Sequence, residues 1–405
     1  MRRFLGCLLL STCIFAAVAS AQQTTDIPSS ALQFVPVAPC RVVDTRRSNG
    51  PLGGPPIQGG TFRSFPIPEG QCNIPATAGA YLLNVTVVPN GRLSYLSVYP
   101  TGENRGVTTT MNSLDGRVKA DAVTVPTGTN GSVDIYASDT TNVVVDIYGY
   151  YAAPSGETLA YFPLPPCRVV DTRGPNGPLG GPYLSGGRER DFPMLQSPCI
   201  PVSVEPVAYS INITVLPRNG SPLGFLTVWA EGLPQPTVAI LNAETGTIVS
   251  NAAVIPAGAG GGIAAFPSND TDLVVDINGF FASPAAGGLS LHTVLPCRVL
   301  DTRHSALGFT GERTIPVLTT PGFPCVTDHN AQAFVFNATA YPQGPLNYLT
   351  LWPDGQGQPL TWTLNAADGA VTSNMAIVPT LNGSVDAYAS GRTQLTLDIM
   401  SYFAP

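Results

Sequence analysis

The sequence predicts an all-β protein made of three tandem β-sandwich repeats, each with one disulfide bond. Three observations lead to this prediction: a motif that occurs three times, a cysteine pair that recurs with it, and many short apolar segments separated by turn residues. Glycine (42 residues) and proline (40 residues) are frequent in the 405-residue chain, and charged residues make up only 11%. Short strands punctuated by Gly, Pro, Asn and Asp are typical of such folds.

The repeat is defined by landmarks that follow in the same order each time. Each copy opens with Cys-Arg-Val-x-Asp-Thr-Arg, and the cysteines Cys40, Cys167 and Cys297 lie 127 and 130 residues apart. An Asn-x-Thr in an apolar run, an aromatic-rich strand, a further Asn and a closing strand with an aspartate follow. The Asn-x-Thr residues are Asn84, Asn212 and Asn337, the later asparagines are Asn112, Asn242 and Asn365, and the closing aspartates are Asp146, Asp276 and Asp398.

A period of this length is a domain rather than a solenoid unit, and it is long enough to bury its own core. We expect three β-sandwich domains at residues 33–153, 158–284 and 289–405, after a leader (1–21) and an N-terminal extension (22–32). The linkers are short and rich in small residues. They predict a row of beads with limited freedom between neighbours.

The N-terminus has the three parts of a secretory signal peptide. Residues 2–3 are arginines, an apolar stretch runs to Val18, and Ala19-Ser20-Ala21 is a small-residue cleavage site. The apolar stretch is short for a membrane span, and a lipoprotein site at Cys13 fits poorly because apolar residues continue beyond it. We expect a secreted protein, extracellular or at the cell surface, with no membrane span.

The cysteines agree with export. Two of the eight belong to the leader, and the other six fall two per repeat. Equal placement in each repeat favours one of the fifteen pairings of six cysteines, and no cysteine has a close Cys or His neighbour at the spacing of a zinc finger. The predicted disulfides are Cys40–Cys72, Cys167–Cys199 and Cys297–Cys325.

Eight short strands are expected in the first repeat, which suits a two-sheet sandwich. A jelly roll is the first choice of topology and an immunoglobulin-like sandwich the second. No segment after the leader has a sustained helical apolar stripe. The expected strands are Gln33–Val37, Thr61–Pro66, Ala80–Val88, Leu93–Tyr99, Val107–Leu114, Ala122–Pro126, Ser132–Ala137 and Asn142–Tyr151.

The charge balance excludes some partners. The formal net charge is −7, it becomes −9 once the two arginines of the leader are removed, and Lys119 is the only lysine. An acidic surface without a basic patch argues against nucleic acid and against anionic membranes.

At these motifs the chain resembles a group of secreted bacterial tandem-repeat proteins. Their units begin with a Pro-Cys-Arg-Val-x-Asp-Thr-Arg signature and end in a strand of the form Asp-Ile-x-Gly-Tyr-Phe. The resemblance covers essentially the whole mature chain, and it implies a surface or extracellular structural module more than a particular activity. The closing glycine is present at Gly149 and Gly279, whereas Met400-Ser401 replaces the pattern in the third unit.

The Asp-Thr-Arg triplets are the best candidate site, because an arginine fork beside an aspartate makes paired hydrogen bonds. The favoured role is a structural salt bridge that holds the following loop, and the alternative is a ligand site. The Asn-x-Thr asparagines are expected to satisfy loop backbone groups rather than to carry glycans. The candidate residues are Asp44, Arg46, Asp171, Arg173, Asp301 and Arg303.

Catalytic patterns do not recur. All three histidines (His292, His304 and His329) lie in the third repeat, so no Ser-His-Asp set repeats. A carboxylate pair such as Asp134 and Asp146 lacks its first member in the second repeat, and the Asp270–Asp276 cluster does not have the spacing of an EF-hand loop. We therefore expect no enzyme activity, no cofactor and no metal.

Two functions remain from the sequence. One is a structural or adhesive surface protein that self-associates into a fibre or layer, with residues 22–32 adding a strand to a neighbouring sheet. The other is a multivalent protein that binds surface glycans. Tyr99, Trp229 and Trp352 of the aromatic-rich strands are candidates to stack on sugars, although packing within a sheet is the favoured interpretation.

Overall fold

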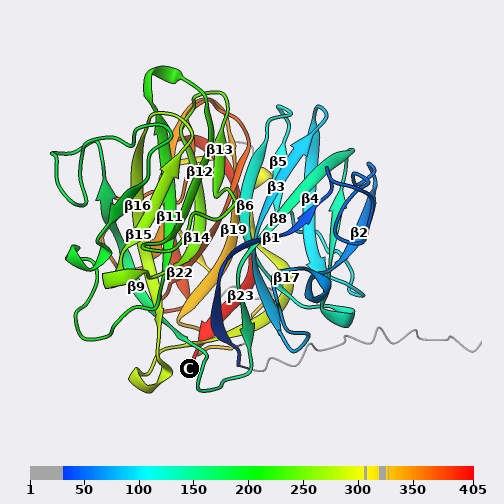
Figure 1. Ribbon diagram of the computed structural model, residues 1–405, viewed down its shortest axis with the longest axis horizontal. Helices are drawn as coiled ribbons and strands as arrows, with labels where there is room; N and C mark the ends of the chain where they lie inside the picture. Colours follow the sequence, from blue (N-terminus) through cyan, green and yellow to red (C-terminus); the bar gives the residue numbers. More distant parts are fainter. Residues whose placement is uncertain (1–30, 305–307, 319–324, 327) are drawn as a thin grey trace, which may run out of the picture.

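The computed structural model describes residues 31–304, 308–318, 325–326 and 328–405, and it is all-β, as predicted (Figure 1). In the first repeat, eight antiparallel strands form two four-stranded sheets, with the orders β1-β8-β3-β6 and β2-β7-β4-β5. Each overlaps an expected strand, although the first extends to Asp44 rather than Val37 and the fifth is confined to Met111–Ser113. They are β1 (Gln33–Asp44), β2 (Thr61–Pro66), β3 (Ala80–Pro89), β4 (Leu93–Pro100), β5 (Met111–Ser113), β6 (Lys119–Pro126), β7 (Ser132–Ala137) and β8 (Thr141–Ala152).

The second repeat has the same arrangement. Its sheets have the orders β9-β16-β11-β14 and β10-β15-β12-β13. The strands are β9 (Ala160–Asp171), β10 (Arg190–Phe192), β11 (Ala208–Pro217), β12 (Leu223–Ala230), β13 (Leu241–Ala243), β14 (Val249–Pro256), β15 (Ile263–Pro267) and β16 (Thr271–Ala282).

The third repeat differs at its end. One long strand, β23, pairs with members of both sheets and joins them into a seven-stranded, barrel-like sheet. In the first repeat the turn around Asp139, whose carboxylate accepts a hydrogen bond from Ser94 N, separates the two matching strands. The strands are β17 (Ser290–Asp301), β18 (Phe309–Pro316), β19 (Ala333–Pro342), β20 (Leu346–Pro353), β21 (Leu364–Ala366), β22 (Thr372–Pro379) and β23 (Ser384–Ala404).

Helical structure in the described residues is limited to single 3₁₀ turns, and none of it is long and apolar enough to cross a membrane. These turns are η1 (Ile67–Glu69), η2 (Thr129–Gly131), η3 (Met194–Gln196), η4 (Arg218–Gly220), η5 (Ala259–Gly261), η6 (Pro284–Ala286) and η7 (Thr302–His304).

The predicted disulfide pairing is confirmed. Each bridge links the first strand of its repeat to the loop after the second strand, with Cα–Cα distances of 5.5–5.8 Å. The pairs are Cys40–Cys72, Cys167–Cys199 and Cys297–Cys325.

The expected row of beads is wrong, because the three repeats pack around a common centre. Strands β6, β14 and β22 contact one another there (Figure 1). One hydrophobic core contains Val85, Ile213 and Val335, one residue from each repeat. Eight consecutive residues of β3, β11 and β19 are buried in each strand, since one face of the sheet covers its own sandwich and the other covers the neighbouring repeats.

The starts of the repeats form a closed triangle of backbone pairs. Phe34 pairs with Leu159, Tyr161 with Leu289, and Leu291 with Leu32. Each repeat thus contacts the next in the same way, and the third contacts the first. The arrangement is a pseudo-three-fold ring. Leu32 lies in the expected N-terminal extension, while the leader and residues 22–30 lie outside the described residues.

An aromatic cluster fills the ring beside this triangle. The ring centroids of Phe34 and Phe281 are 4.5 Å apart, and those of Tyr161 and Phe403 are 4.4 Å apart. A side chain at Gly149 would approach Phe34 to 2.3 Å, and one at Gly279 would meet Tyr161 equally closely. In the third repeat Leu291 stands at the position of Phe34 and Tyr161, and Ser401 stands at the position of the two glycines.

Candidate functional site

The Asp-Thr-Arg triplets form local ion pairs. The Arg46 guanidinium donates to both Asp44 oxygens at 2.8 Å, and Thr45 Oγ1 accepts a hydrogen bond from Val143 N of β8 at 2.8 Å. Burial alone would raise the pKa of Asp44, but the hydrogen bonds and charge of Arg46 outweigh it and hold the pKa below its usual range. The equivalent pairs are Arg173 with Asp171 and Arg303 with Asp301.

A second arginine–aspartate pair crosses each repeat. Arg41, the residue after the first cysteine, donates to Asp146 at 2.8 and 3.2 Å, and Arg168 does the same to Asp276 at 2.8 and 3.1 Å. Burial raises the pKa of Asp276, and the hydrogen bonds of Arg168 oppose that rise. Arg298 and Asp398 form the third pair, at 2.7 and 2.9 Å.

These buried aspartates also hold the neighbouring repeat. Asp276 accepts a hydrogen bond from Trp362 N of the third repeat at 2.9 Å, and Asp398 accepts one from Thr109 N of the first at 3.1 Å. Asp146 is linked in the same way to the Ala239 backbone. The closing aspartates therefore belong to the three interfaces between repeats, which we call the first (1–2), second (2–3) and third (3–1) seams.

The Asn-x-Thr asparagines belong to the same seams. Asn84 donates to the carbonyls of Ala239 and Ile240 at 2.8 and 3.1 Å. Asn212 and Asn337 donate to the matching loops, at Trp362 O and Thr110 O. All three are buried, so they satisfy loop backbone groups as expected, but the loops are those of the next repeat rather than their own.

A further residue at each seam escaped the sequence-based prediction. Asp121, Asn251 and Asn374 occupy equivalent positions, one residue before the partner of the Asn-x-Thr asparagine in the strand pairing. The aligned segments KADAVTVP, VSNAAVIP and TSNMAIVP contain this signal, a polar residue within an apolar strand in every copy.

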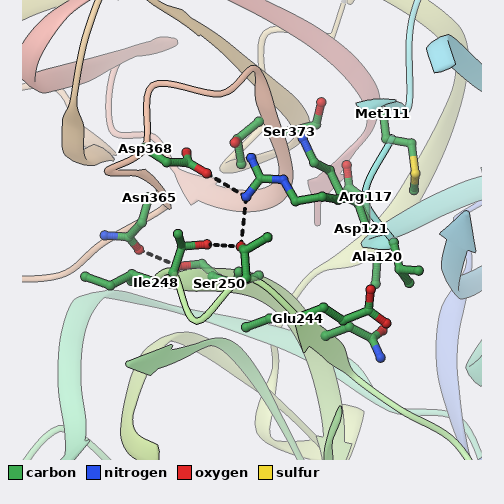
Figure 2. A pocket seen from close by; sticks show the side chains of 18 of the residues that line it. Met111, Arg117, Ala120, Asp121, Glu244, Ile248, Ser250, Asn365, Asp368 and Ser373 are labelled. Carbon is green, nitrogen blue, oxygen red and sulfur yellow. Dashed lines mark hydrogen bonds and ion pairs between the residues drawn. The ribbon is translucent and has the colours of Figure 1, made fainter. Parts of the chain in front are cut away.

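An axial pocket of about 60 Å³ opens where the three repeats meet, and residues of all three line it (Figure 2). Arg117 bridges Asp115 and Asp368, and it hydrogen-bonds Thr245 Oγ1. The hydrogen bond from Arg117 and the charges of Lys119 and Arg117 outweigh burial and hold the pKa of Asp115 at about 2. Charged groups thus join the repeats at this end of the ring.

The sugar-stacking candidates at the ends of the aromatic-rich strands are buried. Trp229 Nε1 donates to Leu233 O at 2.7 Å, Trp352 Nε1 donates to Gln356 O at 3.0 Å, and Tyr99 is 6% exposed. These residues pack the sheets, as the favoured interpretation predicted.

The first aromatic residue of each of these strands is instead half-buried and faces a second ring on the adjacent strand. The three stacked pairs have centroid distances of 5.6–6.1 Å and interplanar angles of 20–25°. We call them the aromatic platforms: Tyr95–Tyr136, Phe225–Phe266 and Tyr348–Tyr388.

In every repeat the loop that reaches the neighbouring repeat has a long polar side chain at an equivalent position, and in the first and third repeats this side chain contacts the platform. Arg105 lies 3.8 Å from the Tyr136 ring centroid and donates to Tyr95 Oη at 3.1 Å. Gln358 hydrogen-bonds Tyr348. Gln235 lines a groove together with Phe225. A ring face with an adjacent amide or guanidinium can both stack on a ligand and donate hydrogen bonds to it.

That groove runs along the first seam and has a volume of about 630 Å³. Arg41 and Arg46 line it from the first repeat, and Phe225, Gln235 and Glu244 line it from the second. At the second seam the matching place is occupied by Trp362, which lies 4.5 Å from the Arg168 guanidinium and 4.9 Å from that of Arg173. Ala239 stands where Trp362 stands in the third repeat, and a small side chain there leaves the first groove open.

Neither a protein-family model nor a curated protein matches this chain.

The residues considered for catalysis lie apart in the structure or are paired with other groups. Asp134 accepts hydrogen bonds from Ser64 and Thr101 in the sheet opposite to that of Asp146. His292 stacks on Tyr402 at a centroid distance of 5.0 Å. Within the described residues no three His, Cys, Asp or Glu side chains are grouped to hold a metal ion.

Proposed function

We propose that this is a non-enzymatic extracellular adhesive protein that binds carbohydrate through its three aromatic platforms. The observation that supports this best is the recurrence of a half-buried stacked aromatic pair in every repeat, with a long polar side chain in contact with it in the first and third repeats. Aromatic faces pack on the apolar faces of sugar rings, and amide or guanidinium groups donate to sugar hydroxyls.

The rigid ring supports multivalent binding. Because each repeat is held to both neighbours by hydrogen bonds and a common core, the platforms keep fixed mutual positions. Three weak sites on a fixed frame gain avidity when they face a repetitive surface. The groove at the first seam extends the Phe225 platform and would give that site the largest contact area.

The strand orders favour a jelly roll for each repeat. In the first and second repeats, the first, eighth, third and sixth strands form one sheet, and the second, seventh, fourth and fifth form the other. We infer this topology, and with it the proposed membership in the group of secreted tandem-repeat surface proteins, from that order and from the Asp-Thr-Arg openings. The disulfides are consistent with an oxidising compartment.

Binding to a glycan array and to insoluble cellulose and chitin tests the proposal. The wild-type protein should bind at least one of these probes, Tyr95→Ala should weaken that binding about tenfold, and combining it with Phe225→Ala and Tyr348→Ala should abolish it. Phe62→Ala is the matched control, since Phe62 is 55% exposed but belongs to no platform. Binding that the triple variant retains, or no binding by the wild type, would contradict the proposal.

The fibre hypothesis loses part of its support, because the repeats form a ring rather than a thread. Its proposed assembly strand, residues 22–32, lies almost wholly outside the described residues. Negative-stain microscopy of the same samples would detect fibres, and fibres without glycan binding would favour the structural role.

A further inference from the structure

The three seams share one hydrogen-bond pattern, and two of them complete it with an asparagine. Asn251 Nδ2 donates to Asn84 Oδ1 and to Ile240 O at 2.8 and 2.7 Å, and its Oδ1 accepts from Ala122 N at 3.1 Å. Asn374 makes the same three bonds at the second seam, with Asn212 Oδ1, Thr363 O and Ala252 N. An amide fits because it offers a donor and an acceptor side by side.

The third seam has an aspartate at this position. Asp121 Oδ1 accepts a hydrogen bond from Met375 N at 3.0 Å, as the asparagine oxygens do at the other seams. Its other oxygen, Oδ2, has no partner, and neither does Asn337 Oδ1, the equivalent of the oxygens that accept from Asn251 and Asn374. Both atoms are buried. An ionised carboxylate can only accept, so two acceptors would be left without a donor.

We infer that Asp121 is a neutral carboxylic acid in the folded protein, and that its O–H donates to Asn337 Oδ1 as a proton-dependent latch on the third seam. The proton restores the donor that the other two seams obtain from an amide. Loss of the proton leaves a buried charge with no counter-ion and removes the donor. The latch therefore loosens as the pH rises.

The third seam is the only one that the chain does not cross, since short linkers join the first repeat to the second and the second to the third. Opening there separates the first and third repeats without breaking a covalent bond. Asn112 lines the axial pocket with Asp121, and its Oδ1 also has no partner. When Asp121 is ionised, its Oδ2 and Asn337 Oδ1 both lack a donor, and this weakens the third seam.

The charged groups around Asp121 do not neutralise it. In the axial pocket, Arg117 is paired with Asp115 and Asp368, and Lys119 with Asp115. Glu244 of the second repeat lines the same pocket and is acidic. Across the seam, Asp398 is paired with Arg298. Of the strands packed against β6, those without Asp, Glu, Lys, Arg or His are β3, β4, β13, β14 and β22. The charged strands are β17 and β23, which carry His292, Asp301, Asp386 and Arg392 besides the Arg298–Asp398 pair.

Burial raises the pKa of Asp121 well above its ordinary value, more than the backbone hydrogen bonds from Met375 and Ala122 lower it. A carboxyl group whose pKa is raised on folding contributes stability that is complete below the unfolded pKa. That contribution is lost as the pH rises towards the folded pKa. The affected window therefore begins near pH 4 and extends upwards.

Asp121→Asn tests the latch, because it supplies the amide that the other seams use. The free energy of unfolding of the wild type and this variant would be measured by denaturant titration from pH 4 to pH 9. We expect the ratio of the two folding equilibrium constants to shift towards the variant by up to tenfold per pH unit until the folded pKa is reached. If the two stability curves ran parallel over this pH range, the inference would be overturned. Parallel curves are expected if Asp121 is ionised and water in the axial pocket satisfies its carboxylate.

Asn251→Asp is the matched variant at the first seam, and it should add a second pH-dependent loss of the same sign. Hydrogen–deuterium exchange locates the effect and does not require that variant to fold. In the wild type, raising the pH should increase exchange at residues 109–111 and 375 more than at the matching residues 239–241 and 252. Asp121→Asn should remove this difference. An equal increase at all seams would contradict a latch at Asp121.

Discussion

At the scale of single residues, the two arginines of each opening motif have different roles. Arg168 reaches the buried closing aspartate Asp276, whereas Arg173 pairs with the more exposed Asp171. Both guanidinium groups lie against the Trp362 ring of the next repeat. The side chains of Asp276 and Asp171 are 4% and 27% exposed. Removing the first arginine leaves a buried carboxylate unpaired, but removing the second does not.

We therefore predict that Arg168→Ala lowers the free energy of unfolding by about 3 kcal/mol, and that Arg173→Ala lowers it by about 1 kcal/mol or less. Denaturant titration of both variants against the wild type measures these losses. Equal losses would mean that the ion pair of the Asp-Thr-Arg triplet contributes as much to the free energy of unfolding as the buried pair. A glycan-binding loss in Arg173→Ala without a change in stability would instead revive the ligand-site interpretation of the triplet.

A second residue-scale prediction concerns acid. The pKa of Asp115 is held at about 2 by Arg117 and Lys119, and a depressed pKa contributes stability that is lost as the pH falls from about 4 to about 2. Because Asp115 and its partners are partly exposed, we expect Asp115→Asn to reduce this acid-dependent loss by about 1 kcal/mol.

Thermal or denaturant unfolding at pH 2, 3, 4 and 6 would measure that change. The control is Glu69→Gln, an exposed carboxylate with no ion-pair partner in the described part of the chain. An acid profile that Asp115→Asn leaves unchanged would show that the charged cluster at the axial pocket does not stabilise the ring.

At the scale of the elements, the strands and disulfides of the first repeat were predictable from local patterns. Turn residues delimit each strand, and the cysteine placement repeats. The packing of the repeats was not predicted, although a trace of it is present in LLNVTVVP and its equivalents. These runs lack the alternation of a half-exposed strand because both faces are buried. Which surface covers the second face depends on contacts between distant residues, and no local pattern specifies them.

For the candidate site, too, some features were predictable from local sequence and others depend on distant contacts. The Asp-Thr-Arg pairs follow from the short spacing of oppositely charged residues. The partners of Asn84, by contrast, are carbonyls 155 and 156 residues away in the chain. The platforms combine strands β4 and β7, so their pairing depends on strand order. Tyr99 and Trp352 were candidates because of their residue type alone. The structure shows that Tyr95 and Tyr348 are the less buried aromatic residues of the same strands.

The disulfides provide the prediction at this scale. Cys167–Cys199 spans 32 residues, and closing a loop of that length constrains the unfolded chain by roughly 3–4 kcal/mol. Replacing both cysteines by serine should lower the free energy of unfolding by about that amount and leave the seams intact. Denaturant titration followed by circular dichroism measures the loss of unfolding free energy. Hydrogen–deuterium exchange at residues 239–241 and 363 shows whether the seams are intact. A loss of the ring in this variant would show that the bridges also position the seams.

At the scale of the whole molecule, each seam joins different surfaces of two repeats, and the series closes after three. An excised second repeat, residues 158–288, carries both surfaces. It keeps Asn212, Asn251 and the acceptor loop at residues 239–240. Its inner sheet would be exposed as a large apolar face if it stayed alone.

We predict that this fragment assembles into a homotrimer with the same seams. Size-exclusion chromatography with light scattering would give its mass. Asn251→Ala should shift the equilibrium towards smaller species, because it removes the two hydrogen bonds that this side chain makes across each seam. A soluble, folded monomer would contradict the prediction, because it would mean that the inner face does not need the neighbouring repeats.

The triangle of backbone pairs at the starts of the repeats limits how such a chain can grow. Each start pairs with one predecessor and one successor, and the set is complete when Leu291 meets Leu32. A fourth copy added by gene duplication would find no unpaired neighbour and would have to displace an existing one or remain outside. Length variation in proteins of this architecture should therefore be found in loops such as the one after each Asp-Thr-Arg, or in whole additional rings. The geometry of one short edge thus sets the number of copies that one ring can hold.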